Sequence, residues 1–258
     1  MNPDSFTLKS AAELDAMRAS GKILASVLSA VSNQVEPGTQ PDHLDEMAES
    51  IIREAGAIPS FKGYNPFPDV RPFPSTLCVS INDAVVHGIP SKEPLKEGDM
   101  ITVDVGVSYD GMLTDAAWTF PVGNVSSSTQ RLLNTTRIAL TDAIDIATIG
   151  HHVGDIGHVI QTKVEQAGFF IIHPLGGHGV GHSIWESPHI PNHGRPGTGF
   201  PLPKGATFAI EPIVGFSSSG IQTDDDGWTI RTNDGGLSAH FEHTLAITDN
   251  GTEVLTQF

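Results

Sequence analysis

The sequence predicts an α+β fold, formed as a single domain over residues 1–258 from two related halves. Segments whose apolar residues recur at helical spacing alternate with β-rich runs, which indicates a mixed chain. The composition shows no linker or low-complexity tract that would divide the 258 residues. An internal repeat is the strongest observation: "LKEGDMITVDVGV" (95–107) and "LPKGATFAIEPIV" (202–214) align without a gap. In each copy a glycine precedes a carboxylate by six residues, so we interpret the match as a duplication.

Four helices are predicted in chain order. Ser10 and Glu13 form a capping-box signature, and the apolar residues that follow recur at helical spacing until the helix ends before Pro37. A second helix begins at Pro41 or Asp42, since proline is favoured in the first turn of a helix. The second, third and fourth helices are predicted over residues 41–54, 128–149 and 153–167.

Strands are predicted in the intervals between the helices. A proline-rich loop, "YNPFPDVRPFP", leads into an apolar strand at residues 77–81. The dipeptide Asp110-Gly111 is the strongest short hairpin signal in the chain. A turn there places Asp104 opposite Ala117 and Asp115 diagonally across the same face, with Cβ atoms up to about 7–8 Å apart. We expect this spacing to be too wide for direct contact between the two acids and suitable for holding something between them.

Four histidines, His178, His182, His189 and His193, lie in "GGHGVGHSIWESPHIPNHG" (176–194) at two identical spacings. On a helix, each H-x-x-x-H pair would share one face and could bind zinc. The glycines weaken helical order and the prolines remove backbone donors, so we predict loop or short strand pieces instead. Each histidine must then find its partners elsewhere in the chain.

Composition excludes several classes of function. The chain has 14 basic and 30 acidic side chains, and its formal charge of −16 argues against binding to nucleic acid or an anionic membrane. Its single cysteine, Cys78, excludes an internal disulfide and suits a reducing compartment. The N-terminus has no apolar core of signal-peptide length, and no run approaches membrane-spanning length. We therefore expect a cytoplasmic protein.

Carboxylates inside apolar runs are the main functional signal. Asp104 and Asp115 lie in the first half of the chain, and Glu211 and Glu242 lie in the second. An unpaired buried carboxylate is destabilising by several kcal/mol, so these acids need cations nearby. Salt bridges are the alternative, but neither strand contains lysine or arginine. Two divalent metals would neutralise all four acids at once, and we favour that interpretation.

The segments "VSINDAVVHGIP", "ITVDVGVSYDGMLTDAAW", "GGHGVGH", "TFAIEPIV" and "DDGWTIRTNDGGLSAHFEHT" together resemble a type I methionine aminopeptidase. The resemblance runs from about Glu13 to the C-terminus. It implies the pita-bread fold, in which two pseudo-symmetric halves form a central curved antiparallel sheet flanked by helices. It also implies two metals, with Asp104 on one, His178 and Glu211 on the other, and Asp115 and Glu242 bridging both. Such mixed ligands suit manganese, iron, cobalt or zinc.

The family's mechanism gives roles to further residues. By this resemblance, a hydroxide activated by both metals attacks the carbonyl after the first residue, and Glu211 acts as the acid and base. His87 in "VVHGIP" matches the family histidine that contacts the scissile region. The apolar side-chain pocket would be lined by Tyr64, Cys78, Ile184 and Trp228, with Phe61 near the rim. Cys78 is expected to line this pocket and not to act as a nucleophile, since no activating partner is visible.

One position departs from the family pattern. Seven residues after His178 the family has a second functional histidine, where this chain has Trp185. Indole donates one hydrogen bond but cannot accept one or carry a proton. Three outcomes are open: a slower peptidase, one that recruits His182 or His189, or a protein that binds metals and peptides with little turnover. We expect His182 to form a surface bond, and His189 and His193 to be solvated.

A second departure is the proline-rich loop at residues 65–74, which is longer than in the family. We expect it at the mouth of the pocket, where it either restricts the peptides that enter or is a neutral insertion.

The expected function is removal of N-terminal methionine from peptides and nascent proteins. The resemblance implies transient ribosome association, although an acidic chain offers no basic patch for it, and we expect a monomer. Two alternatives remain. One is an aminopeptidase with X-Pro specificity, and the other is a homologue that binds metals and peptides with little or no turnover.

Overall fold

Four helices occur in the described part of this computed structural model, residues 5–66 and 70–258. They are α1 (Ala11–Ser32), α2 (Pro41–Glu54), α3 (Ser127–Ile146) and α4 (Val153–Gln166). The first two predicted helices are confirmed, including the capping box between Ser10 and Glu13. The third, predicted to reach residue 149, ends at Ile146 because Ala147 has a non-helical ψ of 65°. The fourth ends one residue earlier than predicted.

Among the same residues the strands pair into four antiparallel sheets. The first contains β1 (Ile58–Pro59), β4 (Met100–Tyr109) and β2 (Leu77–Ile81) in that order, with β5 (Met112–Pro121) also paired to β4. The second contains β13 (Ser238–His240), β10 (Ile213–Gly215) and β6 (Phe170–Ile171), and the third contains β11 (Ile221–Thr223), β12 (Ile230–Thr232) and β3 (Ala84–Val86). The fourth runs β15 (Gly251–Val254), β14 (His243–Thr248), β9 (Thr207–Ile210), β7 (Gly176–Gly179) and β8 (Glu186–Pro191).

The hairpin of β4 and β5 forms as predicted. Asp104 lies opposite Ala117, and Asp115 lies opposite Gly106, two residues away. The φ angles of 49° at Asp110 and 76° at Gly111 build a turn with two left-handed residues. Such a turn matches the twist of the flanking strands, which explains why this dipeptide sets the register.

The two halves repeat the same local geometry. Gly98 and Gly205, the glycines of the internal repeat, have φ angles of 91° and 83°. The Gly98 N–H donates to the Val122 carbonyl at 2.9 Å, and the Gly205 N–H donates to the Ile247 carbonyl at 2.8 Å. Each glycine thus joins the start of one strand to the end of its partner. The structure confirms the related halves that the repeat predicts.

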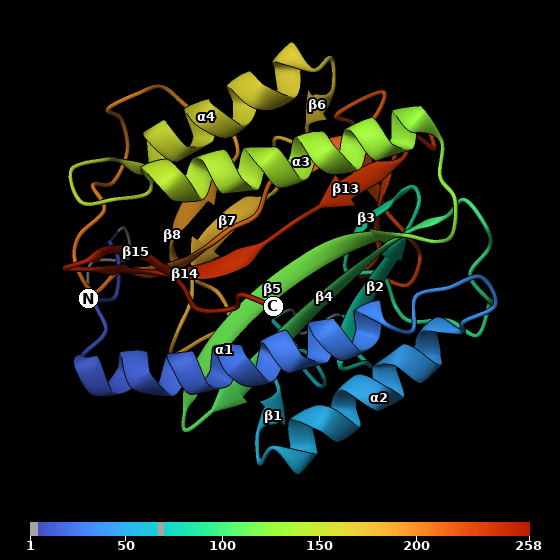
Figure 1. Ribbon diagram of the computed structural model, residues 1–258, viewed down its shortest axis with the longest axis horizontal. Coiled ribbons are helices and arrows are strands. Elements are labelled where there is room, and N and C mark those ends of the chain that lie inside the picture. The colour runs from blue at the N-terminus through green and yellow to red at the C-terminus, as the bar shows by residue number, and fades with distance from the viewer. Residues whose placement is uncertain (1–4, 67–69) are drawn as a thin grey trace.

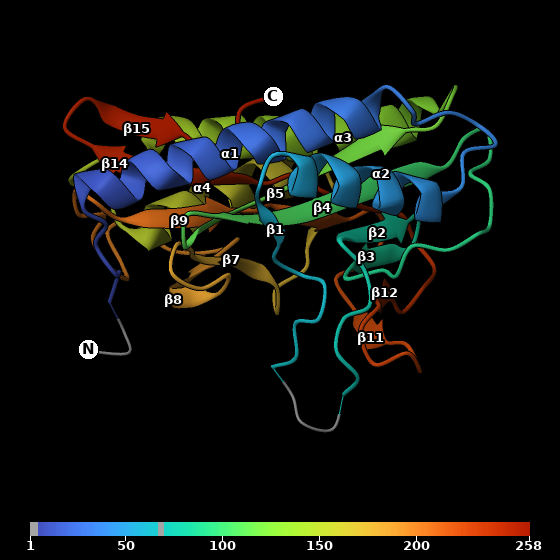
Figure 2. The same ribbon diagram turned by 90° about the horizontal axis from the view of Figure 1, so that it is seen from below.

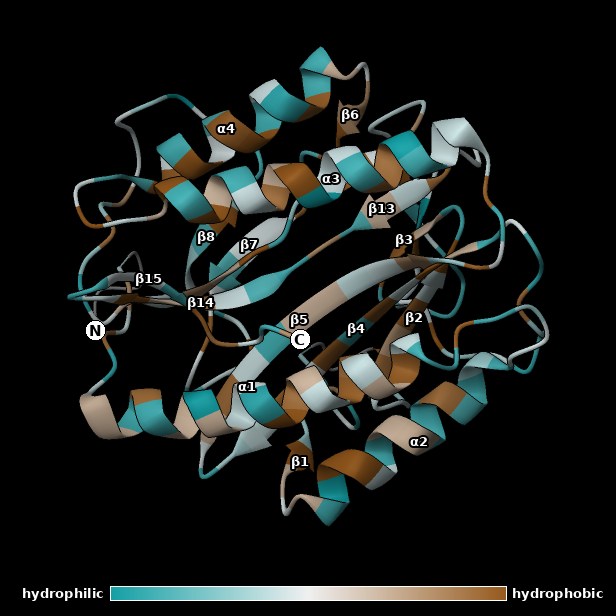
Figure 3. Cartoon of the chain, in the orientation of Figure 1, coloured by the Kyte–Doolittle hydropathy of each residue, from teal (hydrophilic) through white to brown (hydrophobic). Residues whose placement is uncertain are grey.

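The helices form a layer on one side of the strands (Figure 2). In Figure 1, α1 and α2 lie on one side of β5 and β14, and α3 and α4 lie on the other. One apolar core lies beneath α1 and α2 and a second beneath α3 and α4. Figure 3 shows the hydrophobic colour along β4, which is buried between the first helix pair and the remaining strands. Strands β7, β8, β11 and β12 lie on the side away from α1 (Figure 2).

No helix among the described residues is both long enough and apolar enough to cross a membrane.

Candidate metal centre and active-site pocket

A single cavity is lined by every site residue that the sequence predicts. Its walls are Phe61, Tyr64, Phe73, Cys78, Val86, His87, Asp104, Asp115, His178, Ile184, Trp185, Glu211, Trp228, His240 and Glu242. The acids come from neighbouring strand segments: Asp104 from β4, Asp115 from β5, Glu211 directly after β9 and Glu242 directly before β14. The two halves of the chain therefore meet at this cavity, and each contributes a carboxylate pair.

The four acids are deeply placed and lack basic partners. Asp115, Glu211 and Glu242 are 4%, 8% and 2% exposed. Asp104 Oδ1, Asp115 Oδ1 and Glu242 Oε1 are buried without a hydrogen-bond partner among the described residues. Among the described residues, the ion-pair partners of these acids are two histidines, His178 and His240, and no lysine or arginine. Unpaired buried carboxylates fit a site for divalent cations, which supply the missing positive charge.

Asp104 and Asp115 lie diagonally on the hairpin, as predicted, and each carboxyl group influences the pKa of the other. Burial raises the pKa of Asp104 to about 7 and that of Glu211 to about 8, the latter with a contribution from the charge of Asp104. Burial and neighbouring carboxylates also raise the pKa of Asp115 and of Glu242 well above the usual range. Crowded acids of this kind share protons until a cation replaces them.

His178 is oriented as a ligand. Its Nδ1 lies 3.0 Å from the Gly179 carbonyl, and a carbonyl only accepts, so Nδ1 carries the proton. Nε2 then presents a lone pair 3.5 Å from Glu211 Oε1 and 3.8 Å from Asp115 Oδ2. Metal-binding histidines are commonly fixed by such a bond from the other ring nitrogen. Asp115, His178 and Glu242 offer ligand atoms that all lie within 4.8 Å of one another.

The glycines around His178 are explained by close packing. A Cβ on Gly177 would lie 2.1 Å from the Ala209 carbonyl oxygen, and one on Gly179 would lie 2.4 Å from the Ser187 carbonyl oxygen. Strand β7 thus fits between β8 and β9 only without side chains at these positions. The structure confirms strand pieces and not a helix for this segment.

His87 reaches the cavity from a left-handed backbone. Its φ is 58°, an uncommon value for a residue with a side chain. The next residue, Gly88, has no room for a Cβ, which would lie 2.1 Å from the Val79 carbonyl oxygen. Burial lowers the pKa of His87 to about 4, so its imidazole is neutral at physiological pH.

An apolar chamber adjoins the acids. Phe61, Phe73, Cys78, Ile184 and Trp228 form one buried cluster, with Tyr64 packed against it. The Trp228 indole N–H donates to the Arg71 carbonyl at 2.8 Å, which ties the proline-rich loop to the chamber wall. Burial raises the pKa of the Cys78 thiol, in keeping with a lining role. Residues 67–69 of the predicted loop lie outside the described residues.

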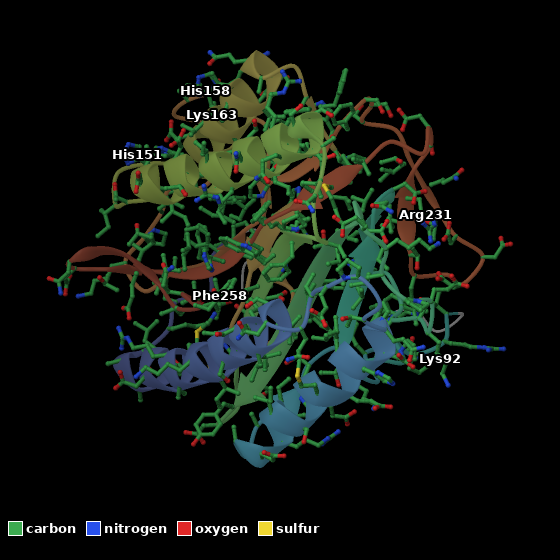
Figure 4. All side chains as sticks on the ribbon, turned by 45° about the vertical axis from the view of Figure 1, so that its right-hand side comes forward. Lys92, His151, His158, Lys163, Arg231 and Phe258 are labelled. Atoms are coloured by element: carbon green, nitrogen blue, oxygen red, sulfur yellow. The ribbon has the colours of Figure 1, made fainter. Side chains whose placement is uncertain are left out.

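Ion pairs connect two segments that contribute residues to this cavity. Arg231, labelled in Figure 4 on β12, lies with Nη1 2.9 Å from Asp83 Oδ1 and with Nε 2.6 Å from Asp224 Oδ2. Asp83 directly precedes β3, the strand that leads into His87. These contacts join the segment that carries Trp228 to the one that carries His87.

Comparison with known proteins identifies the family. Residues 15–249 match the model of metallopeptidase family M24. The chain belongs to this family. A methionine aminopeptidase of Clostridium perfringens is 43% identical over 249 residues, which cover 96% of this chain and 98% of that protein. The structure of a methionine aminopeptidase from Thermotoga maritima is 40% identical, with a TM-score of 0.94, and the match covers 98% of this chain and 100% of that one.

A prolidase from Pyrococcus furiosus is 20% identical to this M24 chain, with a TM-score of 0.78. The match covers 97% of this chain but 65% of that one, and it shows a shared fold. Together with the closer relative from Thermotoga maritima, it confirms the pita-bread fold. Membership of a metallopeptidase family also implies use of divalent metal, in agreement with the unpaired acids.

Sequence reasoning missed three residues of this M24 pocket: Phe73, Val86 and His240. The available signal for His240 was its position two residues before Glu242 in "SAHFEHT", since alternate residues of an extended chain share a face. Its ring is 2% exposed, and burial lowers its pKa to about 3. A buried imidazole beside two acids is therefore a part of the site that the motifs did not reveal.

The other histidines differ in their surroundings. His182 forms the predicted surface bond, with Nε2 2.7 Å from Glu13 Oε1. His189 is exposed, as predicted, and lines a neighbouring cavity that also touches His178. His193, predicted to be solvated, is instead partly buried with its ring edge-on to His173 at a centroid distance of 4.6 Å. The packing of two distant loop segments explains this error.

Trp185 is 41% exposed and lines the same cavity as the acids. Its ring centroid is 5.1 Å from that of Tyr64, 6.0 Å from that of His87 and 6.3 Å from that of His178. A side chain at this position therefore faces the same space as the candidate catalytic groups.

The metal-free M24 protein is expected to lose stability as the pH rises from about 6.5 to 8. Asp104 and Glu211 have folded pKa values near 7 and 8, but about 4 in the unfolded chain. In this window the folded state holds more protons than the unfolded state, so the free energy of unfolding falls with pH. His87 and His178, with pKa values lowered to about 4, act in the opposite direction only below about pH 6.5.

Urea unfolding across this pH range, with and without manganese, measures the effect. The decline should disappear in the metal-loaded protein, because metals bind the deprotonated ligands. Glu211→Gln should make the decline of the metal-free curve shallower, because only the contribution of Glu211 is removed. Equal slopes with and without metal would contradict the expectation.

Proposed function

We propose that this chain removes N-terminal methionine from peptides and nascent proteins. One observation carries the proposal: a single cavity joins the acid and histidine cluster to a chamber walled by Phe61, Phe73 and Trp228. Methionine, an unbranched apolar side chain, suits such a chamber, and sulfur makes favourable contacts with aromatic rings. The relatives that are at least 40% identical over nearly their whole length carry the name methionine aminopeptidase.

We propose that the acid cluster holds two divalent ions. Asp104 would bind one, His178 and Glu211 the other, and Asp115 and Glu242 both. The unpartnered carboxylate oxygens and the orientation of His178 Nε2 support this assignment. The oxygen-rich donor set with one imidazole suits manganese, iron, cobalt or zinc.

The chain's own groups orient the peptide and move the proton. Divalent metals in such a centre supply a water acidic enough to attack at neutral pH and polarise the scissile carbonyl. The apolar chamber would take the methionine side chain and exclude water around it. Glu211 would accept the proton of the attacking water and return it to the leaving amine. His87, a neutral imidazole in the cavity wall, would hydrogen-bond the substrate beside the bond that breaks.

Turnover of Met-Ala-Ser by metal-free protein, titrated with manganese, iron(II), cobalt or zinc, tests this function. We expect turnover that requires metal and releases free methionine. An Ala-Pro peptide should be cleaved much more slowly. Preferential cleavage of Ala-Pro would favour the X-Pro alternative. The similarity to the prolidase from Pyrococcus furiosus supports a shared fold and not this specificity.

Trp185 supports a second candidate, a peptide- and metal-binding protein with little turnover. Its indole lies where the family pattern has a histidine, next to His87 and His178. Calorimetric binding of Met-Ala-Ser without release of methionine, at every metal tested, would establish this candidate and overturn the enzyme proposal.

We also propose that the protein acts as a monomer in the cytoplasm, in transient contact with ribosomes. The family resemblance supports this setting, and sedimentation of the protein alone and with ribosomes tests it.

A further inference from the structure

His240 is the one histidine of the cavity to which the proposed function gives no role. It ends β13 and is 2% exposed, and neither ring nitrogen has a hydrogen-bond partner among the described residues. Its backbone is held firmly. The His240 N–H donates to Thr119 Oγ1 at 2.9 Å, and the Thr119 hydroxyl donates to the His240 carbonyl at 2.7 Å. The backbone of His240 is therefore fixed by Thr119 of β5, and its ring lines the cavity.

The Nε2 atom of His240 faces two carboxylate oxygens. It lies 3.5 Å from Glu211 Oε2 and 3.7 Å from Glu242 Oε2. The other oxygen of Glu211, Oε1, lies 3.5 Å from His178 Nε2. The Glu211 carboxylate thus lies between two imidazoles, with one oxygen toward each.

The two imidazoles differ in their second nitrogen. The Gly179 carbonyl fixes the proton of His178 on Nδ1 and leaves a lone pair on Nε2. His240 has no such acceptor at Nδ1 in the described part of the chain. Once metal holds Glu211 and Glu242 in the ionised form, their oxygens only accept hydrogen bonds, so a proton on His240 Nε2 is attracted to them, whereas a lone pair there would be repelled. The surroundings therefore favour opposite tautomers in the two rings.

We propose that His240 is a positioning residue for Glu211, whose Oε2 accepts a hydrogen bond from the Nε2–H of His240. A small closure of the 3.5 Å separation completes this bond. The bond restrains the rotation of the Glu211 carboxylate and keeps Oε1 toward His178. The inference rests on the proposed function for its catalytic consequence, but the tautomer and the bond do not depend on turnover.

The first test reads the tautomers directly in the zinc-loaded protein, because zinc is diamagnetic and metal binding keeps Glu211 and Glu242 ionised. Long-range proton–nitrogen NMR spectra distinguish a proton on Nε2 from one on Nδ1 in each histidine. We expect Nε2–H for His240 and Nδ1–H for His178. His240→Gln assigns the signals by their loss, and the same change at exposed His189 is the matched control. A proton on Nδ1 of His240 would overturn the proposal whether or not the protein cleaves peptides.

The second test compares two substitutions in the metal-loaded protein. His240→Leu removes the donor, and we expect kcat on Met-Ala-Ser to fall by about 10-fold to 100-fold, as for other residues that orient a metal ligand, with little change in KM. His240→Gln keeps an N–H donor and should recover most of kcat. The visible spectrum of bound cobalt should keep the parental shape in both variants, because His240 is not a ligand.

Other outcomes contradict the proposal in different ways. A changed cobalt spectrum and weaker metal binding in both variants would make His240 a metal ligand. An unchanged kcat in His240→Leu would leave it a structural residue only. If the parent protein releases no methionine, the proposed function fails, and the NMR result still decides the role of His240.

Discussion

Asp115→Asn is expected to abolish metal binding and to reduce turnover by about 10³-fold or more. Asp115 is 4% exposed, the charge of Asp104 raises its pKa, and its Oδ2 lies 3.8 Å from His178 Nε2. Asparagine keeps the shape of the side chain but removes the charge that would bridge two ions. A metal centre supplies several kcal/mol of transition-state stabilisation, and the loss of about 4 kcal/mol corresponds to about 10³ in rate.

The same substitution should stabilise the metal-free protein at neutral pH, because it removes one of several crowded carboxylates. Calorimetric titration with manganese, Met-Ala-Ser turnover and urea unfolding measure these effects together. Asp110→Asn is the matched control. It lies exposed in the turn of the same hairpin at φ 49°, a conformation that asparagine tolerates. Parental metal affinity in Asp115→Asn would contradict the bridging role.

Trp185→His is expected to raise kcat on Met-Ala-Ser by about 10²-fold, the scale of one preorganised hydrogen-bond donor in a transition state. The ring at this position lies 6.0 Å from His87 and 6.3 Å from His178 between centroids, so an imidazole there would face the reacting peptide. Imidazole can donate, accept and carry a proton, whereas indole can only donate.

Steady-state kinetics of the parent, Trp185→His and Trp185→Phe measure this effect. Phenylalanine preserves an aromatic ring against Tyr64 without a donor and should not gain activity. High parental activity that Trp185→His leaves unchanged would mean that another group has taken over the role of the family histidine. Inactivity in all three would support the peptide-binding candidate.

Much of the fold is predictable from local pattern. The capping box at Ser10 begins α1, and Asp110-Gly111 sets the register that places Asp104 opposite Ala117. These signals succeed because caps and tight turns are decided by a few neighbouring residues. The end of α3 was less predictable, since apolar spacing continues past Ile146 while the backbone at Ala147 leaves the helix.

Which residues come together in the cavity was also predictable in part. Acids in apolar strands indicate a cation site, and every residue predicted to bind metal or substrate lines the same cavity. His240 escaped this reasoning, because its only signal was its position two residues before Glu242, which does not by itself indicate a role. Its importance depends on the approach of β13 to Glu211, a contact between separate strands. The packing of His193 on His173 was missed for the same reason.

Residue types and short spacings thus specified the halves, the hairpin and the acid cluster, because each follows from neighbours along the chain. Packing decided the burial that raises the pKa of Asp104, the opposite surroundings of His178 and His240, and the position of Trp185 beside His178. Those features depend on how strands distant in sequence approach one another, and side-chain orientation across such contacts is set by the whole fold.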